Sequence, residues 1–421
     1  QAGKDTPEHR TASTSPWNRP QEIGTYYEAE VPDTLDLAER ARLGLNHIAR
    51  ITSERLGCEM YYGGPFHFYN KPVLMLMANS LMACQCKFME AAAYLRLMTG
   101  SDPQLEREAK MLAMMASRVG EEGIYWVYPS KDKPWLGAVE DGPYAHVHGQ
   151  GDMMHAMIAW YQYTGNPKWK ELVDRMVDGV DRLMVTHKDG YAYFPTHGVN
   201  PSGYFNSCYY KGRGWKDTEE PKDEKHGEEG SLFVHQGRIA EALADWYMLT
   251  GNEQALRVAG ELVRFYLQPR FWADREQGEY PGVVGAEHAH WQGHIHGYLG
   301  ILQGIMSYAK ATNDARLKAF VRDGYEWTRQ AAFARIGLVG DGQGCGCARM
   351  IKLAVMLTEA GVGDYWEDVD LYIRNQGTEM QLTPEDIPYM IKWGEGKPEV
   401  PPGPPHTTET YGLGAYVTEG V

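Results

Sequence analysis

A short turn motif recurs along this chain, and it restricts the possible fold more than any other feature. Its clearest copies lie at Thr99–Asp102, Thr164–Pro167 and Thr250–Glu253, and looser copies lie at 311–314 and 361–364. In the clear copies, Thr and Gly end an aromatic-rich run, and Ser or Asn follows. Glycine adopts the left-handed conformation that ends a helix, and Asn, Asp or Ser caps the next helix. The motif therefore predicts a series of helical hairpins.

The runs that precede these turns also resemble one another: EAAAYLRLMTG, HAMIAWYQYTG, EALADWYMLTG and GIMSYAKATND. Five hairpins are visible, and a first helix over about 35–50 can pair with the C-terminal segment to make a sixth. The spacing is irregular because of long insertions at 120–145, 188–230 and 269–289. A solenoid keeps a fixed period, so an irregular series favours a closed ring. We predict an all-α (α/α)6 toroid with short β insertions near 190–195 and 278–284.

The chain is expected to have two parts of unequal length. Residues 1–32 are polar and contain prolines, which predicts an irregular N-terminal arm. Asp33 and Thr34 precede apolar residues at helical spacing, so we expect a capped helix to begin there. Residues 33–421 are interpreted as one toroidal catalytic domain. The start at Gln1, without an initiator methionine, predicts a mature bacterial protein that is secreted or periplasmic, although a recombinant start would look the same.

Composition restricts the partners. A net charge of −15 and a pI near 5.5 disfavour nucleic acid and anionic membranes, and no apolar run is long enough to cross a bilayer. The chain has 12 Trp, 27 Tyr and 10 Phe, of which about two-thirds are expected in the core. The others lie beside Gly, His and Asp in the loops, where flat aromatic faces suit sugar rings. We therefore predict an oligosaccharide partner.

Carboxylates gather in the loops that precede the helical runs. A glycosidase needs two carboxyl groups, one as an acid and one as a base or nucleophile. The first candidates are Asp152 and Glu287, and the next are Asp141 and Asp341. Asp152 lies at the head of an expected helix, so an equally good interpretation of this residue alone is an N-terminal cap.

Ten further residues are candidates for holding substrate. They are Tyr144, His146, His148, His235, Arg238, His290, Trp291, His294, His296 and Arg349. Four histidines and one glutamate lie within the ten residues 287–296, a density that core packing does not explain. A zinc site is one interpretation, but the metalloprotease spacing His-Glu-x-x-His is absent, so hydrogen bonding to sugar hydroxyls or to a substrate carboxylate is preferred. We assign no metal and no cofactor.

The six cysteines do not form a disulfide framework. Cys345 and Cys347 flank a single glycine rather than forming a Cys-x-x-Cys pair, so each is interpreted as a small buried hydrophobic residue. Arg349, one helical step further, suits a carboxylate. The Gly-x-Ser-x-Gly elbow, the P-loop and the dinucleotide fingerprint are all absent, which excludes the reactions that depend on them.

Two segments carry a family resemblance. Residues 346–353 (GCARMIKL) and 365–375 (YWEDVDLYIRN) resemble the end of the catalytic toroid in the β-L-arabinofuranosidases of glycoside hydrolase family 127. Residues 32–46 (PDTLDLAERARLGLN) are similar to exo-β-glucuronidase-like glycosidases of the same architecture. The resemblance implies an (α/α)6 toroid that hydrolyses a glycosidic bond.

The resemblance does not extend to that family's metal site. In the arabinofuranosidases, a Glu-x-Cys pair and a later Cys-Cys pair hold zinc around a cysteine nucleophile. Here the glutamate position falls on Gln343 or Cys345, and no Cys-Cys pair follows Cys347. Neither the zinc nor the cysteine nucleophile is therefore carried over.

The function that these observations favour is a glycoside hydrolase, exo-acting on an acidic (uronic-acid-containing) or a plant or algal oligosaccharide, with a possible likeness to β-glucuronidases. Carboxylates at the mouth of the toroid would supply general acid and base catalysis. Two alternatives remain: a polysaccharide lyase that uses a His/Tyr pair on a uronate, and a non-catalytic glycan-binding toroid.

Overall fold

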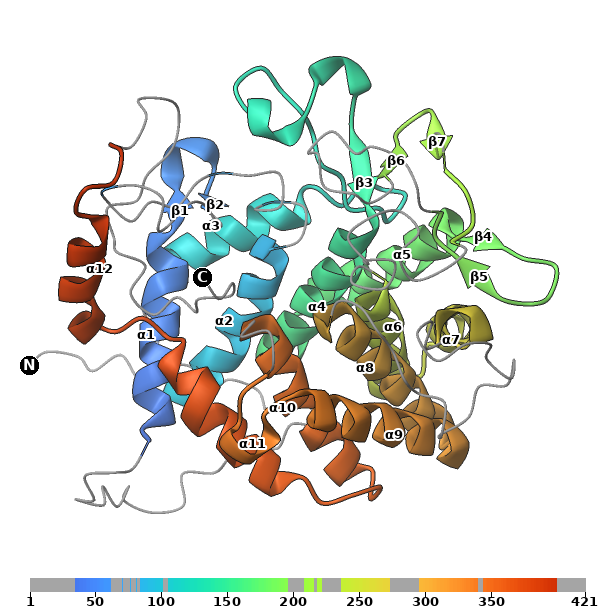
Figure 1. Ribbon diagram of the computed structural model, residues 1–421. Coiled ribbons are helices and arrows are strands. Elements are labelled where there is room, and N and C mark those ends of the chain that lie inside the picture. Colours follow the sequence, from blue (N-terminus) through green and yellow to red (C-terminus); the bar gives the residue numbers. More distant parts are fainter. Residues whose placement is uncertain are drawn as a thin grey trace, which may run out of the picture.

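The computed structural model of the protein describes residues 35–61, 70, 76, 81, 84–100, 105–195, 208–215, 218–221, 236–272, 295–339 and 344–399. Within these residues there are twelve α-helices and seven β-strands, and each strand has two or three residues. Figure 1 shows the helices arranged as hairpins around a common centre. The predicted all-α (α/α)6 toroid with short β insertions is confirmed.

The helices of the hairpins form two layers. The inner helices are α2 (Gln85–Thr99), α4 (Val147–Thr164), α6 (Gly237–Thr250), α8 (Ile295–Thr312) and α10 (Gly344–Glu359). Each inner helix packs against the next one in this series. The outer helices are α3 (Leu105–Ala116), α5 (Pro167–Leu183), α7 (Glu253–Tyr266), α9 (Ala315–Ala331) and α11 (Trp366–Tyr372). Each outer helix packs on the inner helix that precedes it, so five hairpins follow one another around the centre.

The first helix and the C-terminal segment lie together, as predicted for a sixth hairpin. Helix α1 (Leu37–Arg50) packs on α2, and the Gln381 amide nitrogen donates to the Arg40 carbonyl at 3.0 Å. Helix α12 (Ile387–Gly394) lies beside α1 in Figure 1. Helix α1 begins two residues after the expected start at residue 35. Its cap is Asp36, whose carboxylate accepts from the Glu39 amide at 2.9 Å, and not Asp33 or Thr34.

Burial distinguishes the two layers. Helix α4 is buried without a break from Val147 to Trp160, as expected of a helix surrounded by protein. Helix α5 buries Trp169, Leu172 and Val173 but exposes the positions between its buried rows. This amphipathic pattern places α5 between the inner layer and solvent.

The turn motif behaves as the sequence predicts. Gly100, Gly165 and Gly251 adopt φ values of 59°, 68° and 77°, and each amide donates to a carbonyl of the preceding helix. The structure also shows the role of the threonine in this motif. In every inner helix the threonine hydroxyl donates to the backbone carbonyl four residues earlier, which satisfies one of the carbonyl acceptors left without a partner at a helix end.

The strands lie in the insertions. Strands β3 (Tyr144–His146), β6 (Cys208–Tyr210) and β7 (Gly214–Trp215) form an antiparallel sheet, and β1 (Thr52–Ser53) pairs with β2 (Glu59–Met60). Strand β4 (Val185–Thr186) pairs with β5 (Ala192–Tyr193), which confirms the strand predicted near 190–195. The one predicted near 278–284 lies outside the described residues.

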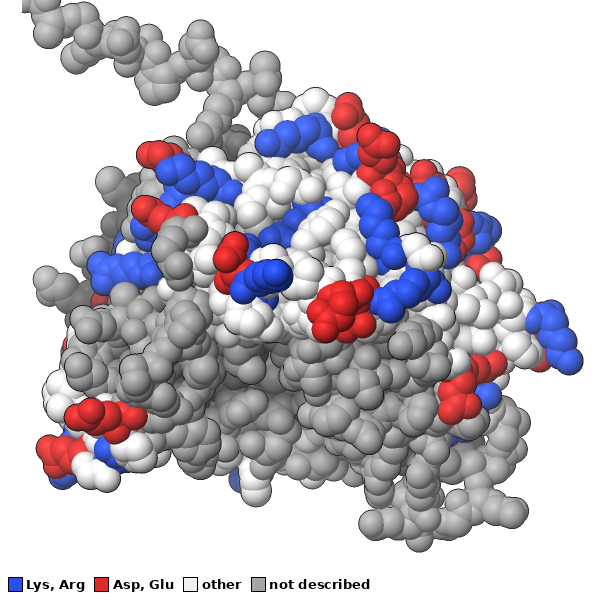
Figure 2. Space-filling model, turned by 90° about the horizontal axis from the view of Figure 1, so that it is seen from above, with Lys and Arg blue, Asp and Glu red and all other residues white. Residues whose placement is uncertain are grey.

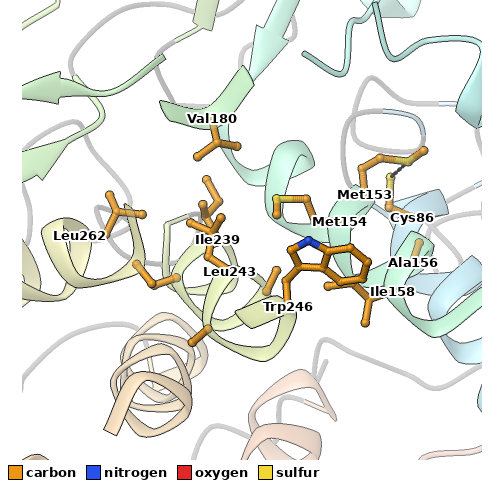
Figure 3. Close-up of a cluster of buried hydrophobic side chains, with 14 of the residues drawn as sticks. Cys86, Met153, Met154, Ala156, Ile158, Val180, Ile239, Leu243, Trp246 and Leu262 are labelled. Carbon is orange, nitrogen blue, oxygen red and sulfur yellow. Dashed lines mark hydrogen bonds between the residues drawn. The ribbon is translucent and has the colours of Figure 1, made fainter. Parts of the chain in front are cut away.

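The core lies between the inner helices and their outer partners. Figure 3 shows Trp246 and Leu243 of α6 with Met154 and Ile158 of α4, all of which are buried. The Cys86 thiol of α2 lies 4.0 Å from the Met153 sulfur of α4. Continuous apolar contact of this kind fixes the positions of neighbouring inner helices.

Glycines let the inner helices approach closely near their N-terminal ends. A Cβ on Gly237 of α6 would lie 2.4 Å from the Gly300 carbonyl oxygen of α8. A Cβ on Gly151 of α4 would lie 2.8 Å from the Ile239 amide nitrogen of α6. Side chains next to these glycines are therefore brought into contact across three helices.

Candidate active site

Asp152 lies at the centre of a group of charged side chains between the inner helices. It is fully buried in the second turn of α4, and the N-cap position of that helix is occupied by His146. The alternative that Asp152 is the helix cap is therefore wrong. Its two carboxylate oxygens instead contact Nε of Arg238 at 2.9 Å and Nε2 of His148 at 2.8 Å. Nζ of Lys87 lies 3.8 Å away.

Arg238 connects carboxylates from three helices. Besides Asp152 of α4, its guanidinium contacts Glu90 of α2 and lies 3.6 Å from Glu241 of its own helix. Arg238 and all three carboxylates are largely buried. An arginine fork suits such multiple pairing because its five N–H donors point in fixed directions.

Helices α8 and α10 complete the group. Lys352 of α10 contacts Glu241, and the Lys352 side chain is 40% exposed to solvent. Arg349 of α10 donates to the side-chain oxygen of Gln303 of α8, and Gln303 donates back to the Arg349 carbonyl at 3.2 Å. We call the whole group the central cluster; its members are Lys87, Glu90, His148, Asp152, His155, Arg238, Glu241, Gln303, Arg349 and Lys352.

The carboxylates of the central cluster are held ionised. Burial would raise the pKa of Asp152, but His148 and the neighbouring cations outweigh burial and hold the pKa well below its usual range. The same balance lowers the pKa of Glu90, where Arg238 is the main opposing charge. It also lowers the pKa of Glu241, with Lys352 as the strongest opposing charge.

The histidines are held neutral. Burial lowers the pKa of His146 to about 3 and the pKa values of His148 and His155 to about 4. Nε2 of His155 lies 3.1 Å from the Arg238 carbonyl, so a neutral ring donates there and leaves Nδ1 as an acceptor. These rings can pass or orient a proton without adding a positive charge to the cluster.

Asp245 is the exception among the acids. It lies one turn beyond Glu241 on α6, and burial together with the Glu241 charge raises its pKa to about 6. The Ser307 hydroxyl hydrogen-bonds to it. Asp245 thus changes protonation closer to neutral pH than the carboxyls of the central cluster do.

A shared register explains which residues meet. Near the C-terminal end of each inner helix lies the motif threonine, Thr99, Thr164, Thr250, Thr312 or Thr358. The residues nine positions before these threonines are Glu90, His155, Glu241, Gln303 and Arg349. The residues twelve positions before them are Lys87, Asp152, Arg238, Gly300 and Gly346. Positions three apart share a helix face, so eight of the ten members of the central cluster lie in two adjacent layers of one repeated pattern. His148 and Lys352 lie about one turn outside these layers, at opposite ends.

This register was the signal that could have found the missed residues. The aligned runs begin with Glu90, His155 and Glu241, but our interpretation of those runs as packing helices passed over them. A polar residue at one fixed position of otherwise apolar helices is expensive to bury unless it has a partner. Alignment on the threonines would have placed these three side chains together.

The structure brings together four of the predicted site residues: Asp152, His148, Arg238 and Arg349. His146 lies next to them, with its ring centre 6.2 Å from that of His148. His296 lies in the first turn of α8 and is partly exposed.

Two predicted residues lie in other surroundings. Asp141 pairs with Arg213 at 3.6 Å in a surface loop. Tyr144 is fully buried and its hydroxyl donates to the Leu136 carbonyl at 3.0 Å, an arrangement that favours packing. The remaining predicted site residues, which lie outside the described residues, are Glu287, Asp341, His235, His290, Trp291 and His294.

Most of the cysteines are buried. Cys347 is buried as predicted, whereas Cys345, which was also expected to be buried, is partly exposed. Burial raises the pKa of Cys347 to about 12, so its thiol is protonated at neutral pH, and its sulfur lies 3.7 Å from the Tyr372 carbonyl. In the part of the chain that the structure describes, no three His, Cys, Asp or Glu side chains are grouped as metal ligands.

Comparison with known proteins supports the fold and the resemblance. Residues 96–291 match the family described as "Beta-L-arabinofuranosidase, GH127 catalytic domain", which confirms the resemblance seen in the sequence. No curated protein matches the chain.

Solved structures show the same architecture. The family 76 α-mannanase of Bacteroides thetaiotaomicron is 9% identical with a TM-score of 0.50, and the match covers 90% of this chain and 92% of that one. The cellobiose 2-epimerase of Bacillus thermoamylovorans is 11% identical with a TM-score of 0.50, covering 82% and 88%. Both support the toroid fold.

The family 127 structures are longer proteins. The β-L-arabinofuranosidase of Geobacillus stearothermophilus is 16% identical with a TM-score of 0.44, covering 84% of this chain and 52% of that one. The chain therefore spans about half the length of the family 127 structures that it matches.

Proposed function

We propose that this protein is a glycoside hydrolase that acts at the central cluster, removing terminal units from an acidic (uronic-acid-containing) or a plant or algal oligosaccharide. The observation that carries the proposal is Asp152, a buried and ionised carboxylate held by Arg238 and His148 inside the segment that matches a glycosidase catalytic domain. We also propose a secreted or periplasmic location, where the protein would meet such substrates.

Asp152 suits the role of base or nucleophile. Its lowered pKa keeps it ionised at neutral pH, and Arg238 holds the carboxylate in one orientation. Glu287 remains the predicted acid partner. Glu90 and Glu241 join the candidates because both contact the same arginine.

The cations of the cluster support an acidic substrate. The side chains of Lys87 and Lys352 are 34% and 40% exposed. Lys87 pairs with Asp152 and Lys352 pairs with Glu241, and both can contact solvent or substrate at the same time. Positively charged groups around a reaction centre attract anionic sugars and fix the position of their carboxylates.

A neutral β-L-arabinofuranoside is the second candidate substrate. It is favoured by the family match over residues 96–291, which form the region that contributes Asp152, His155, Arg238 and Glu241. This reaction would need the same acid and base groups but no recognition of a carboxylate.

A screen of chromogenic glycosides tests the proposal and separates the two substrates. The panel includes uronides, arabinofuranosides and neutral hexosides, each with and without chelator. Release of the chromogen from uronides supports the first candidate, and release from arabinofuranosides supports the second. Unsaturated products that absorb in the ultraviolet would instead identify a lyase. Binding of oligosaccharide without any product would identify a glycan-binding protein.

A further inference from the structure

Arg349 is the one arginine of the central cluster that forms no ion pair with a described carboxylate, and Glu241 and Asp152 act on it only at longer range. It is 7% exposed, and among the described residues its side chain hydrogen-bonds to the neutral amide of Gln303. Its Nε has no hydrogen-bond partner there. Arg238, in contrast, contacts three carboxylates. A buried cation without a counter-charge is costly, and a ligand that supplies the charge recovers that cost.

The ion pairs of the cluster leave one arginine without a carboxylate in contact. The ionised carboxylates of the cluster are Glu90, Asp152 and Glu241, and its cations are Lys87, Arg238, Arg349 and Lys352. Asp245, which lies outside the cluster, interacts with Lys352. The histidines beside them are neutral. Lys87, Arg238 and Lys352 each contact a carboxylate, so the unmatched charge belongs to Arg349.

The surroundings of Arg349 hold its guanidinium in place. Gln303 is almost fully buried, and its amide nitrogen is bound to the Arg349 carbonyl, so its oxygen is turned toward the guanidinium. A Cβ on Gly300 would lie 3.0 Å from the guanidinium carbon. Gly300 occupies the register position that holds Lys87, Asp152 and Arg238 in other helices. The absence of a side chain there makes space for Arg349.

We propose that Arg349, oriented by Gln303 and accommodated by Gly300, binds the carboxylate of a uronic-acid unit and sets the preference of this site for acidic sugars. This inference rests on the proposed function for the position of the substrate, but carboxylate binding itself does not require turnover. A guanidinium can pair with a carboxylate through two parallel N–H···O bonds, which a neutral hydroxymethyl group cannot match.

The test compares matched ligands. Each pair consists of a nitrophenyl uronide and the neutral glycoside that differs from it by a hydroxymethyl group in place of the carboxylate. Calorimetry measures binding, and chromogen release measures kcat/KM. The full-length chain is used as wild type, Arg349→Lys, Gln303→Glu and Arg257→Gln. Arg257 lies on the outer helix α7, where it pairs with Asp181 and Glu261, so it is the matched control.

The wild type should bind the uronide of at least one pair more tightly than its neutral counterpart. Arg349→Lys removes the fork, and Gln303→Glu gives Arg349 an internal carboxylate in a side chain of similar shape. Both should lower the ratio of uronide to neutral affinity by roughly 10- to 100-fold, because a charge-assisted hydrogen bond contributes about 1.5–3 kcal/mol. Arg257→Gln should leave the ratio unchanged.

Three results would overturn the inference: no preference for uronides in the wild type, a preference retained in both cluster variants, or an equal loss of both ligands. Circular dichroism identifies variants that have not folded. If one of Gln303→Glu and Arg349→Lys fails to fold, the other still tests the inference. A wild type that prefers uronides but releases no product would contradict the proposed hydrolase and leave the carboxylate site supported.

Discussion

Single residues of the central cluster have roles that differ by their contacts. Asp152, Glu90 and Glu241 share Arg238, whereas Arg349 is bound to a neutral amide. The same residue type therefore serves two purposes here. Arg238 holds the protein's own acids in place, and Arg349 is proposed to bind the carboxylate of a ligand.

Asp152→Asn should abolish most of the turnover without unfolding the protein. The amide keeps the shape of the side chain and a hydrogen-bond acceptor for Arg238, but it cannot act as a base or nucleophile. We expect kcat to fall by about 10²–10⁴-fold, the usual contribution of such a group. Chromogen release measures the loss, with Asp181→Asn on the outer helix α5 as control. Full activity of Asp152→Asn would refute the assignment.

Arg238→Met should damage the cluster more than Asp152→Asn does. It leaves three buried carboxylates without their shared partner, and an uncompensated buried charge costs about 3–5 kcal/mol. Urea unfolding should show this loss of stability. The loss should be smaller at acidic pH, where the carboxylates take up protons. A stability equal to that of the wild type at neutral pH would show that Arg238 does not hold the group together.

At the scale of the elements, glycines set the distance between inner helices. Gly237 and Gly151 bring α6 against α8 and α4 at the level of the cluster. Gly237 directly precedes Arg238, and Gly151 directly precedes Asp152. The close approach of the backbones at these glycines therefore also brings the charged side chains together.

Gly237→Ala should therefore destabilise the protein and disturb the site. The new Cβ would lie 2.4 Å from the Gly300 carbonyl, and the rigid backbone of α8 must move to admit it. We expect a loss of about 1–3 kcal/mol in the free energy of unfolding, measured with urea. Gly44→Ala on α1 is the matched control. Its Cβ would meet the mobile end of Leu95 at 3.2 Å, so a change below about 0.5 kcal/mol is expected. Equal costs would contradict the argument.

At the scale of the whole molecule, the protein buries its charges at the centre and mixes the remaining ones outside. Figure 2 shows Lys and Arg side chains interspersed with Asp and Glu over the described part of one face. In the part of the chain that the structure describes, no helix is long and apolar enough to cross a membrane.

Buried histidines make the stability of the whole molecule depend on pH. Burial lowers the pKa values of His47, His148 and His155 from 6.5 to about 4, and that of His146 to about 3. The unfolded chain therefore binds more protons than the folded one below pH 6.5. The contribution of these neutral histidines to the free energy of unfolding is complete above about pH 6.5 and is lost as the pH falls toward 4. The loss is on the order of 2–3 kcal/mol for each histidine.

Urea unfolding at pH 7.5 and pH 5 measures this effect. The midpoint should be clearly lower at pH 5. His47→Gln removes one of the four groups without touching the central cluster, so its midpoint should depend less on pH than that of the wild type. A midpoint that is the same at both pH values would show that these rings are protonated in the folded protein.

The sequence by itself determined the helical hairpins, their closure into a toroid and the family resemblance. These follow from local chemistry: glycines that end helices, threonines and asparagines at their ends, and apolar runs between them. Six of the ten members of the central cluster escaped prediction. Glu90, His155 and Glu241, for example, lie at the start of apolar runs, where the local sequence alone does not distinguish a member of a buried charged cluster from a packing position. Only the tertiary structure decided which charges meet. Contacts such as that between Arg238 and Glu90 join distant helices, and their geometry depends on how closely glycine lets the backbones approach.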